Sequence, residues 1–261
     1  MSSEPLDVLP LWSIFLFATA ISMVALEVGY RFGYWRHAHA SGEKQEPVAA
    51  MVGSILGLLA FMLAFTFSMA AARFDARRQV VLEEANAIST TYLRTRLLPQ
   101  PQRGESANLL RQYTAMRVDN LKEGKVVELI ARSEELHERL WSQAAAAAEN
   151  DPHSIPTGLF LQSLNETIDL HSKRVFVSLH SRVPFTIWLS LFSLTLLGMA
   201  SVGYQAGLSG MRRSPEMPVL TLSFAGVMLL IVDLDRGHEG LLRVSQQATI
   251  DLLRTMQAPH P

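Results

Sequence analysis

The sequence has no cysteine, and long parts of it have no charged residue. The absence of cysteine excludes disulfides, thiolate metal sites and cysteine nucleophiles. Charged residues make up 18% of the chain, yet four stretches of 19, 25, 26 and 16 residues contain none: Val8–Leu26, Val48–Ala72, Val183–Leu208 and Met217–Val232. Apolar runs of about 20 residues match the hydrocarbon core of a bilayer, and a helix satisfies every backbone group there. The chain is therefore predicted to be an all-α, polytopic membrane protein.

Other absences narrow the function. Positions Met1–Asp7 hold two acids and no Lys or Arg, so the first apolar run lacks the basic flank of a cleaved signal peptide and is predicted to remain as a membrane helix. The net charge of −1, without a basic cluster, argues against nucleic acid as the main partner. The sequence also lacks a nucleophile elbow, a phosphate-binding glycine loop and zinc-ligand spacing. No catalytic residue, metal site or cofactor is predicted, and the protein is not expected to be an enzyme.

The uncharged runs divide the chain into six predicted parts. Transmembrane helices are expected at 8–28, 48–72, 183–208 and 217–234, a helical extramembrane domain at 73–182 between the second and third of them, and a C-terminal tail at 235–261. The fourth run is the shortest, since 16 residues of helix rise only about 24 Å. It can span a bilayer with local thinning, or by taking Asp233 and Leu234 into the headgroup zone.

The segment 73–182 carries 15 basic and 14 acidic residues and is predicted to be helical throughout. Nothing breaks the chain between Pro47 and Pro99, so the second membrane helix is expected to continue to about Leu98. A turn containing Pro99, Pro101 and Gly104, and a break at Asn150-Asp151-Pro152, would separate two further helices, with Gly124 as a candidate interruption. Apolar residues spaced for one helical face form three stripes: Val81, Ala85, Ile88 and Tyr92; Leu109, Tyr113, Met116 and Leu121; and Leu161, Leu164, Ile168 and Val175.

The basic residues near the membrane give two opposing indications of orientation. The segment 29–47 has Arg31, Arg36 and Lys44, whereas the tail before the first helix has none, which would place that loop inside. Counted over all membrane boundaries, eight basic residues lie on the side of 73–182 and five on the side of the loops. The larger count predicts that the helical domain and both termini are cytoplasmic.

Small residues recur along one face of the second membrane helix, at Gly53, Gly57, Ala60, Ala64 and Ser68. Small residues let helix backbones approach closely in lipid, so one interpretation of this ridge is packing within the membrane. The other interpretation is that the helix lines a central pathway of an oligomer. In that case Phe61 and Phe65, four residues apart on a neighbouring face, would form a hydrophobic pore neck.

Several polar residues sit at helix ends or within the helical segment. Glu27, Asp233 and Asp235 end the first and fourth membrane helices, where ionisable groups are candidates for function. The favoured interpretation is ordinary local pairing, such as Glu27 with Arg31. In the helical segment, inward polar groups are expected to set helix register. These groups are Asp75 with Arg77 and Arg78, Glu84 with Asn86, and Asn165 with Asp169 and Arg174. The histidines His137, His153, His171 and His180 are predicted to be solvated or packed singly.

Three separated motifs resemble a known family. The run Ala72-Arg73-Phe74-Asp75-Ala76-Arg77-Arg78, followed by Glu83-Glu84-Ala85-Asn86-Ala87, is similar to the exit of the second membrane helix in the bestrophin-like domain proteins of bacteria. The stretch Leu164–Asp169, with Arg174 and Pro184, resembles the return helix of that family. Asp233-Leu234-Asp235-Arg236, with Gly240–Ser245, resembles its closing motif.

The resemblance implies four membrane helices, a helical domain between the second and third, and a distant likeness to bestrophins. Bestrophins are pentameric anion channels whose second helix lines a narrow hydrophobic neck. By analogy of fold, the chain is expected to form a homo-oligomer, with a pentamer as the implied state, and to conduct small anions. The acidic calcium cluster of those channels has no counterpart in this C-terminal tail. The alternative hypothesis is a non-conducting membrane scaffold or sensor whose helical domain binds a partner.

Overall fold

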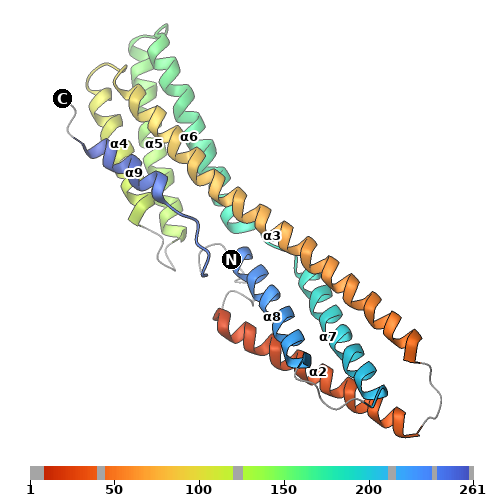
Figure 1. Cartoon of the computed structure of the whole chain (residues 1–261). Helices are drawn as coiled ribbons and strands as arrows, with labels where there is room; N and C mark the ends of the chain where they lie inside the picture. Colours follow the sequence, from red (N-terminus) through yellow and green to blue (C-terminus); the bar gives the residue numbers. More distant parts are fainter. Residues whose placement is uncertain (1–8, 40–44, 120–125, 211–215, 237–239, 259–261) are drawn as a thin grey trace. The chain divides into compact units, whose positions relative to one another are not determined.

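The computed structural model describes residues 9–39, 45–119, 126–210, 216–236 and 240–258. These residues form helices and no strand, as predicted: α2 (Leu11–His39), α3 (Gln45–Thr95), α4 (Gln102–Asp119), α5 (Val126–Asn150), α6 (Ile155–His180), α7 (Phe185–Leu208), α8 (Glu216–Asp235) and α9 (Gln247–Gln257) (Figure 1). Four helical stretches are long and apolar enough to cross a membrane, and they lie within Leu11–His39, Pro47–Thr95, Ile155–Leu208 and Glu216–Asp235. The predicted class, an all-α protein with four candidate membrane helices, is confirmed.

The chain divides into two compact units. The first unit comprises Met1–Phe74 and Arg182–Leu242, and the second comprises Asp75–Ser181 and Arg243–Pro261. Helix α3 contributes to both units without interruption, as the absence of breakers between Pro47 and Pro99 predicted.

The first unit contains α2, the N-terminal part of α3, α7 and α8. Its main core joins α3 to α7 and α8 through Leu59, Leu63, Ala70, Trp188, Leu191, Met228 and Ile231. A second core cluster joins Leu26 of α2 to Met199 and Ala206 of α7 and Met217 of α8. Pro184 stands at the N-cap of α7, a position where its missing N–H removes no helical hydrogen bond.

Four glycines bring α2 and α7 into backbone contact within the first unit. Both helices carry a Gly-x-x-x-Gly pattern: Gly29 and Gly33 on α2, and Gly203 and Gly207 on α7. A Cβ added at Gly203 would overlap the carbonyl oxygen of Leu26, and one added at Gly29 would overlap that of Ala200. Backbone atoms cannot move aside as a side chain can, so these positions require glycine.

The second unit is a bundle of the C-terminal part of α3 with α4, α5, α6 and α9. Its core draws large apolar side chains from all five of these segments, including Ile88, Tyr113, Leu140, Phe160 and Met256. The predicted stripe on α3 is buried, and Leu109, Tyr113 and Leu164 of the other two stripes are buried with it. Thr91 of α3 donates to the Ser163 carbonyl at 2.9 Å and lies 3.0 Å from the Thr167 hydroxyl, which fixes α3 against α6.

Two features of the second unit add to the predictions. The segment between the predicted turn at Pro101 and the predicted break at Asn150 forms two helices, α4 and α5, whose apolar faces pack on each other; Gly124, the candidate interruption, lies outside the described residues. The predicted C-terminal tail contains helix α9, whose Met256 is buried in the core of the second unit. The sequence of α9 is amphipathic, with Ile250, Leu252 and Leu253 among polar residues, but eleven residues are too few to form a stable helix without tertiary contacts.

Candidate functional site

The N-terminal part of α3 has one buried and one exposed face. The buried face packs on α7 and α8 and is formed by Val52, Leu59, Leu63, Thr66 and Ala70. These residues recur at steps of seven, four, three and four, which is the spacing of one helical stripe. The Thr66 hydroxyl donates to the carbonyl of Met62 at 2.8 Å, so this face leaves no polar side chain without a partner.

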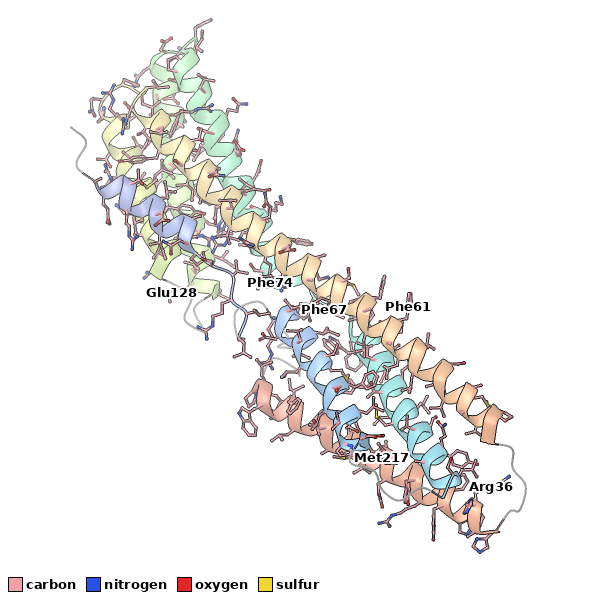
Figure 2. All side chains as sticks on the ribbon, viewed as in Figure 1. Arg36, Phe61, Phe67, Phe74, Glu128 and Met217 are labelled. Carbon is pink, nitrogen blue, oxygen red and sulfur yellow. The ribbon has the colours of Figure 1, made fainter. Side chains whose placement is uncertain are left out.

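Phe61 and Phe65 lie on the opposite face of α3. Their side chains are 66% and 56% exposed, and Figure 2 shows Phe61 on the side of α3 away from α7 and α8. Two aromatic rings one helical turn apart, on a helix of membrane length, need a bilayer or another protein surface to cover them. The single chain does not cover them.

The ridge of small residues is exposed as well. A Cβ added at Gly53 or Gly57 would meet nothing within 4 Å, and Ala60, Ala64 and Ser68 are exposed. Among the described residues, no helix of the same chain packs on this ridge, so its packing within the membrane stays a prediction about the contact of α3 with lipid or with another copy of the chain. The reason is that α7 and α8 contact α3 through the larger side chains of its opposite face, while close packing through glycine occurs between α2 and α7.

A group of charged residues at the C-terminal end of α8 binds backbone groups of the first unit. The Asp233 carboxylate, 2% exposed, accepts hydrogen bonds from the backbone N–H groups of Leu241 (2.8 Å) and Leu242 (3.1 Å). The Asp235 carboxylate accepts the backbone N–H of Val183 at 2.8 Å, just before α7. Arg236 is buried and donates to the carbonyl of Leu9. These residues of the predicted closing motif hold chain segments together through backbone groups.

The second unit contains a buried charge cluster centred on Glu84 of α3. The Glu84 carboxylate, 1% exposed, accepts from Arg117 of α4 at 2.9 Å, from the Tyr113 hydroxyl at 2.7 Å and from Arg174 of α6. Arg174 also donates to the Gln246 side-chain oxygen at 2.9 Å, next to the start of α9. One carboxylate thus links α3, α4 and α6, and its partner Arg174 extends the link to the segment before α9.

Two histidines complete this cluster. The ring centroids of His137 (α5) and His171 (α6) lie 4.9 Å apart, and His171 Nδ1 is 3.2 Å from the Tyr113 hydroxyl. Both side chains are buried, which corrects the prediction that they are solvated or packed singly. The prediction treated each histidine alone, whereas their proximity follows from the packing of α5 against α6.

Burial and neighbouring charges shift the pKa values of the cluster. Burial, together with the positive charge of Arg117, lowers the pKa of each histidine to about 4. Burial opposes ionisation of Glu84, but Arg117 and Arg174 outweigh it and hold the pKa of Glu84 below its usual value. Burial, together with the Glu84 charge, raises the pKa of the Tyr113 hydroxyl well above its usual value. At neutral pH the cluster therefore holds an ionised Glu84, two neutral imidazoles and a neutral phenol.

The structure brings together only some of the other polar residues singled out in the sequence. Arg77 is buried and donates to the Ser181 carbonyl at 3.3 Å. In contrast, Asp75, Asn86, Asn165 and Asp169 are exposed, so the expectation that inward Asn and Asp residues set register is not met at these positions. Glu27 forms the predicted local pair with Arg31, at 2.8 Å.

Sequence reasoning missed Arg117 and Tyr113 as partners of Glu84, and it missed the histidine pair that packs on Tyr113. A signal was present, because Arg117 follows Tyr113 by four residues and so lies on the same face of α4. His137 similarly belongs to the buried stripe of α5, together with Ser133, Leu136 and Leu140. Polar residues that interrupt an apolar stripe are candidates for a buried network. Among the residues that the structure describes, no three His, Asp or Glu side chains are placed to hold a metal ion.

Comparison with known proteins agrees with this architecture. A family model for the Bestrophin-like domain matches residues 12–249, which is most of the chain. No curated protein matches the sequence.

Crystal structures share the fold at low sequence identity. A membrane protein variant has a TM-score of 0.67 at 16% identity, with 97% of this chain and 100% of that chain covered. Two mutants of a bacterial bestrophin homologue from Klebsiella pneumoniae have TM-scores of 0.66 and 0.65, at 17% and 16% identity, covering 94% and 93% of this chain and 97% and 96% of theirs.

Proposed function

The chain belongs to the Bestrophin-like domain family, and on that premise we propose that it forms an oligomeric ion channel whose pore neck is built from α3. Small anions are the permeant ions that the family resemblance implies. The observation that carries the proposal is the position of Phe61 and Phe65, exposed on the face of α3 that α7 and α8 do not cover. In a ring of subunits, this face is available to meet a central axis.

The proposal places the predicted spans 8–28, 48–72, 183–208 and 217–234 in a bacterial inner membrane. The segment 73–182 is then a helical domain inserted between the second and third spans, with 235–261 beside it, on the cytoplasmic side. The division of the chain into compact units near Phe74 and Arg182 supports these boundaries. The buried charge cluster around Glu84 is a further support, because charged groups concentrate outside the hydrocarbon core.

A neck of phenylalanines controls conduction by excluding water, not by an electrostatic barrier. A narrow apolar constriction disfavours a continuous water column, so an ion must lose hydration without any polar replacement. The small residues beside the rings, Gly57, Ala60 and Ala64, allow neighbouring copies of α3 to approach closely enough for the rings to narrow the path. Removing a ring should therefore widen the path and increase flux.

Ion flux from liposomes tests the proposal. Purified protein is reconstituted at equal density as wild type, as Phe61→Ala, as Phe65→Ala and as Phe17→Ala, and chloride and potassium efflux are followed separately. Phe17 on α2 is 62% exposed and serves as a matched aromatic control outside α3. We expect increased flux for the two α3 variants alone, with chloride as the faster ion.

Other outcomes would count against the proposal. Leak-free liposomes for wild type and both α3 variants would contradict channel activity and leave a non-conducting membrane protein. Equal increases for all three variants would indicate bilayer disruption instead of a neck.

Native mass spectrometry in detergent adds the subunit number: a closed ring supports a shared axis, whereas a monomer excludes one. Protease cleavage within 73–182 in inverted, but not right-side-out, vesicles is expected for a cytoplasmic domain.

A further inference from the structure

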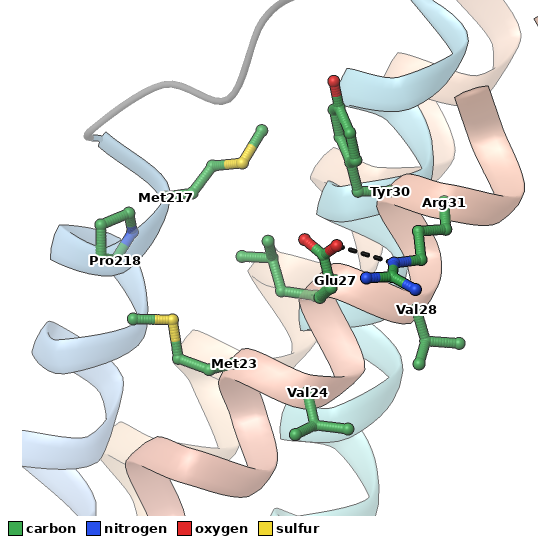
Figure 3. A pocket seen from close by; sticks show the side chains of 9 residues that line it. Met23, Val24, Glu27, Val28, Tyr30, Arg31, Met217 and Pro218 are labelled. Atoms are coloured by element: carbon green, nitrogen blue, oxygen red, sulfur yellow. Dashed lines mark hydrogen bonds and ion pairs between the residues drawn. The ribbon is translucent and has the colours of Figure 1, made fainter.

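A groove of about 440 Å³ lies between α2 and α8 in the first unit (Figure 3). Its apolar end is formed by Met23 and Val24 of α2 and by Met217 and Pro218 of α8, whereas Val28 lies beside Arg31. The other end contains Glu27, Tyr30 and Arg31. Tyr30 and Arg31 also line a second hollow that continues along α2 past Tyr34 and Trp35 to His39. The two hollows therefore share Tyr30 and Arg31 as lining residues, and the groove itself has an apolar and a polar end.

The position of the groove in the sequence matches the edge of a bilayer. The uncharged run of α2 ends at Leu26, and that of α8 begins at Met217. The apolar end therefore lies beside residues of hydrocarbon depth, and the polar end lies beyond them. Tyr34 and Trp35 are 54% and 53% exposed, and exposed Tyr and Trp on a membrane helix are typical of the headgroup level.

Arg31 provides the charge at the polar end. Its Nε donates to the Glu27 carboxylate at 2.8 Å, which orients the guanidinium beside the groove (Figure 3). The Arg31 side chain is 75% exposed, and its terminal nitrogens lie between Glu27 and Val28 in Figure 3. A guanidinium has five N–H donors, and a pair of them matches the two oxygens of a phosphate.

We propose that this groove binds a phospholipid with an anionic headgroup, whose acyl chain occupies the apolar end while its phosphate contacts Arg31. The change of polarity along the groove, from Met23 and Met217 to Arg31, follows the order of chain, phosphate and headgroup in such a lipid. The exposed Tyr34 and Trp35 cover the glycerol and headgroup region. This lipid site is independent of ion conduction through α3.

Lipid retention in native mass spectrometry tests the site. Protein in mild detergent is equilibrated with phosphatidylglycerol or with phosphatidylcholine carrying the same acyl chains, and bound lipid is counted per chain. We expect wild type to retain phosphatidylglycerol preferentially. Arg31→Gln should reduce that retention about fivefold, since one basic residue near an anionic lipid has an effect of that order. The preference over phosphatidylcholine should disappear with it.

Matched variants separate the groove from general effects. Arg132→Gln removes an arginine from a similar exposed pair with Glu128, at 3.1 Å, and should retain lipid as wild type does. Val24→Trp fills the apolar end and should reduce retention of both lipids. Leu16→Trp, at an α2 position that is 55% exposed and does not line the groove, should not. Unchanged thermal unfolding of each variant shows that the chain is folded.

Three results would overturn the proposal. Equal retention of the two lipids by wild type would contradict recognition of an anionic headgroup. Equal losses in Arg31→Gln and Arg132→Gln would contradict a specific contact with Arg31. The third result would identify a second copy of the chain as the occupant. The natural chain has no cysteine, so Val24→Cys introduces a single thiol. Efficient oxidation of this variant to a disulfide-linked dimer in membranes would show that a neighbouring chain covers the groove.

Discussion

Glu84 on α3 and Arg174 on α6 form an ion pair in the interior of the second unit, although 90 residues separate them in the sequence. Arg117 and Tyr113 of α4 contact the same carboxylate. This carboxylate is therefore the point at which three helices of the bundle are held in one register. Removing one partner of a buried pair is costly because the other charge remains without compensation.

Glu84→Gln should destabilise the second unit by about 3 kcal/mol, since the buried guanidinium of Arg117 and the largely buried one of Arg174 would lose their countercharge. The adjacent Glu83 is the matched control: it pairs with Lys173 at 2.8 Å, but both side chains are substantially exposed. Glu83→Gln should change stability by less than about 1 kcal/mol. Thermal unfolding of the full chain in detergent, followed by circular dichroism, distinguishes them. Equal shifts for the two variants would contradict the structural role of Glu84.

The paired histidines predict a loss of stability in mild acid. The folded pKa of His137 and of His171 is about 4, below the ordinary value of 6.5, so the unfolded chain binds protons first as the pH falls. Stability is complete above pH 6.5 and declines between pH 6.5 and about 4, by up to about 1.4 kcal/mol per pH unit for each histidine. Unfolding midpoints measured across this window test the prediction.

Glutamine at both positions, His137→Gln with His171→Gln, should flatten that pH profile, because the amide does not titrate. His153, exposed in the turn before α6, is the control, and His153→Gln should leave the profile as in wild type. Glu84 contributes a separate loss at lower pH: its folded pKa is depressed, so its stabilisation is lost as the pH falls through and below its ordinary value of 4.5. A profile that remained steep between pH 6.5 and 5 in the double variant would contradict this assignment.

Gly203→Ala should weaken the contact between α2 and α7. The added methyl would overlap the Leu26 carbonyl, and the two helices would have to separate along Gly29, Gly33, Gly203 and Gly207. Gly226→Ala is the matched change on α8, where a Cβ meets nothing within 4 Å. It should be neutral, or stabilising by up to about 1 kcal/mol through helix propensity. The yield of folded protein and its unfolding temperature should fall for Gly203→Ala alone.

Asp233→Ala should release the turn that follows α8, because its carboxylate accepts the N–H groups of both Leu241 and Leu242. Hydrogen exchange at these two amides should accelerate, while exchange within α8 stays slow. Asp251, exposed on α9, provides the control Asp251→Ala, which should leave the turn unchanged. Slow exchange of the two amides in Asp233→Ala would show that another group holds the turn.

The sequence predicted the class of protein and the helical periodicity well. Uncharged runs marked the membrane helices, because a charge in hydrocarbon is expensive, and the stripe Val81, Ala85, Ile88 and Tyr92 is buried as its spacing required. It suggested an interruption at Gly124 but did not predict that α4 and α5 pack on each other. Helix-favouring residues run through that region, and local propensity carries little information about where a chain reverses. Spacing also could not distinguish the ridge at Gly53 and Gly57 from the Gly-x-x-x-Gly pairs of α2 and α7.

What the sequence determined by itself is where apolar and charged residues lie along the chain, and hence the membrane class, the helical content and the family. What only the tertiary structure decided is which residues meet. It assigned close packing to Gly29 and Gly203, left the ridge beside Phe61 exposed, and brought Glu84, Arg174, His137 and His171 together from three helices. The physical reason is that periodicity specifies the face of one helix, whereas a contact depends on the crossing of two. That crossing is settled by close packing over the whole unit.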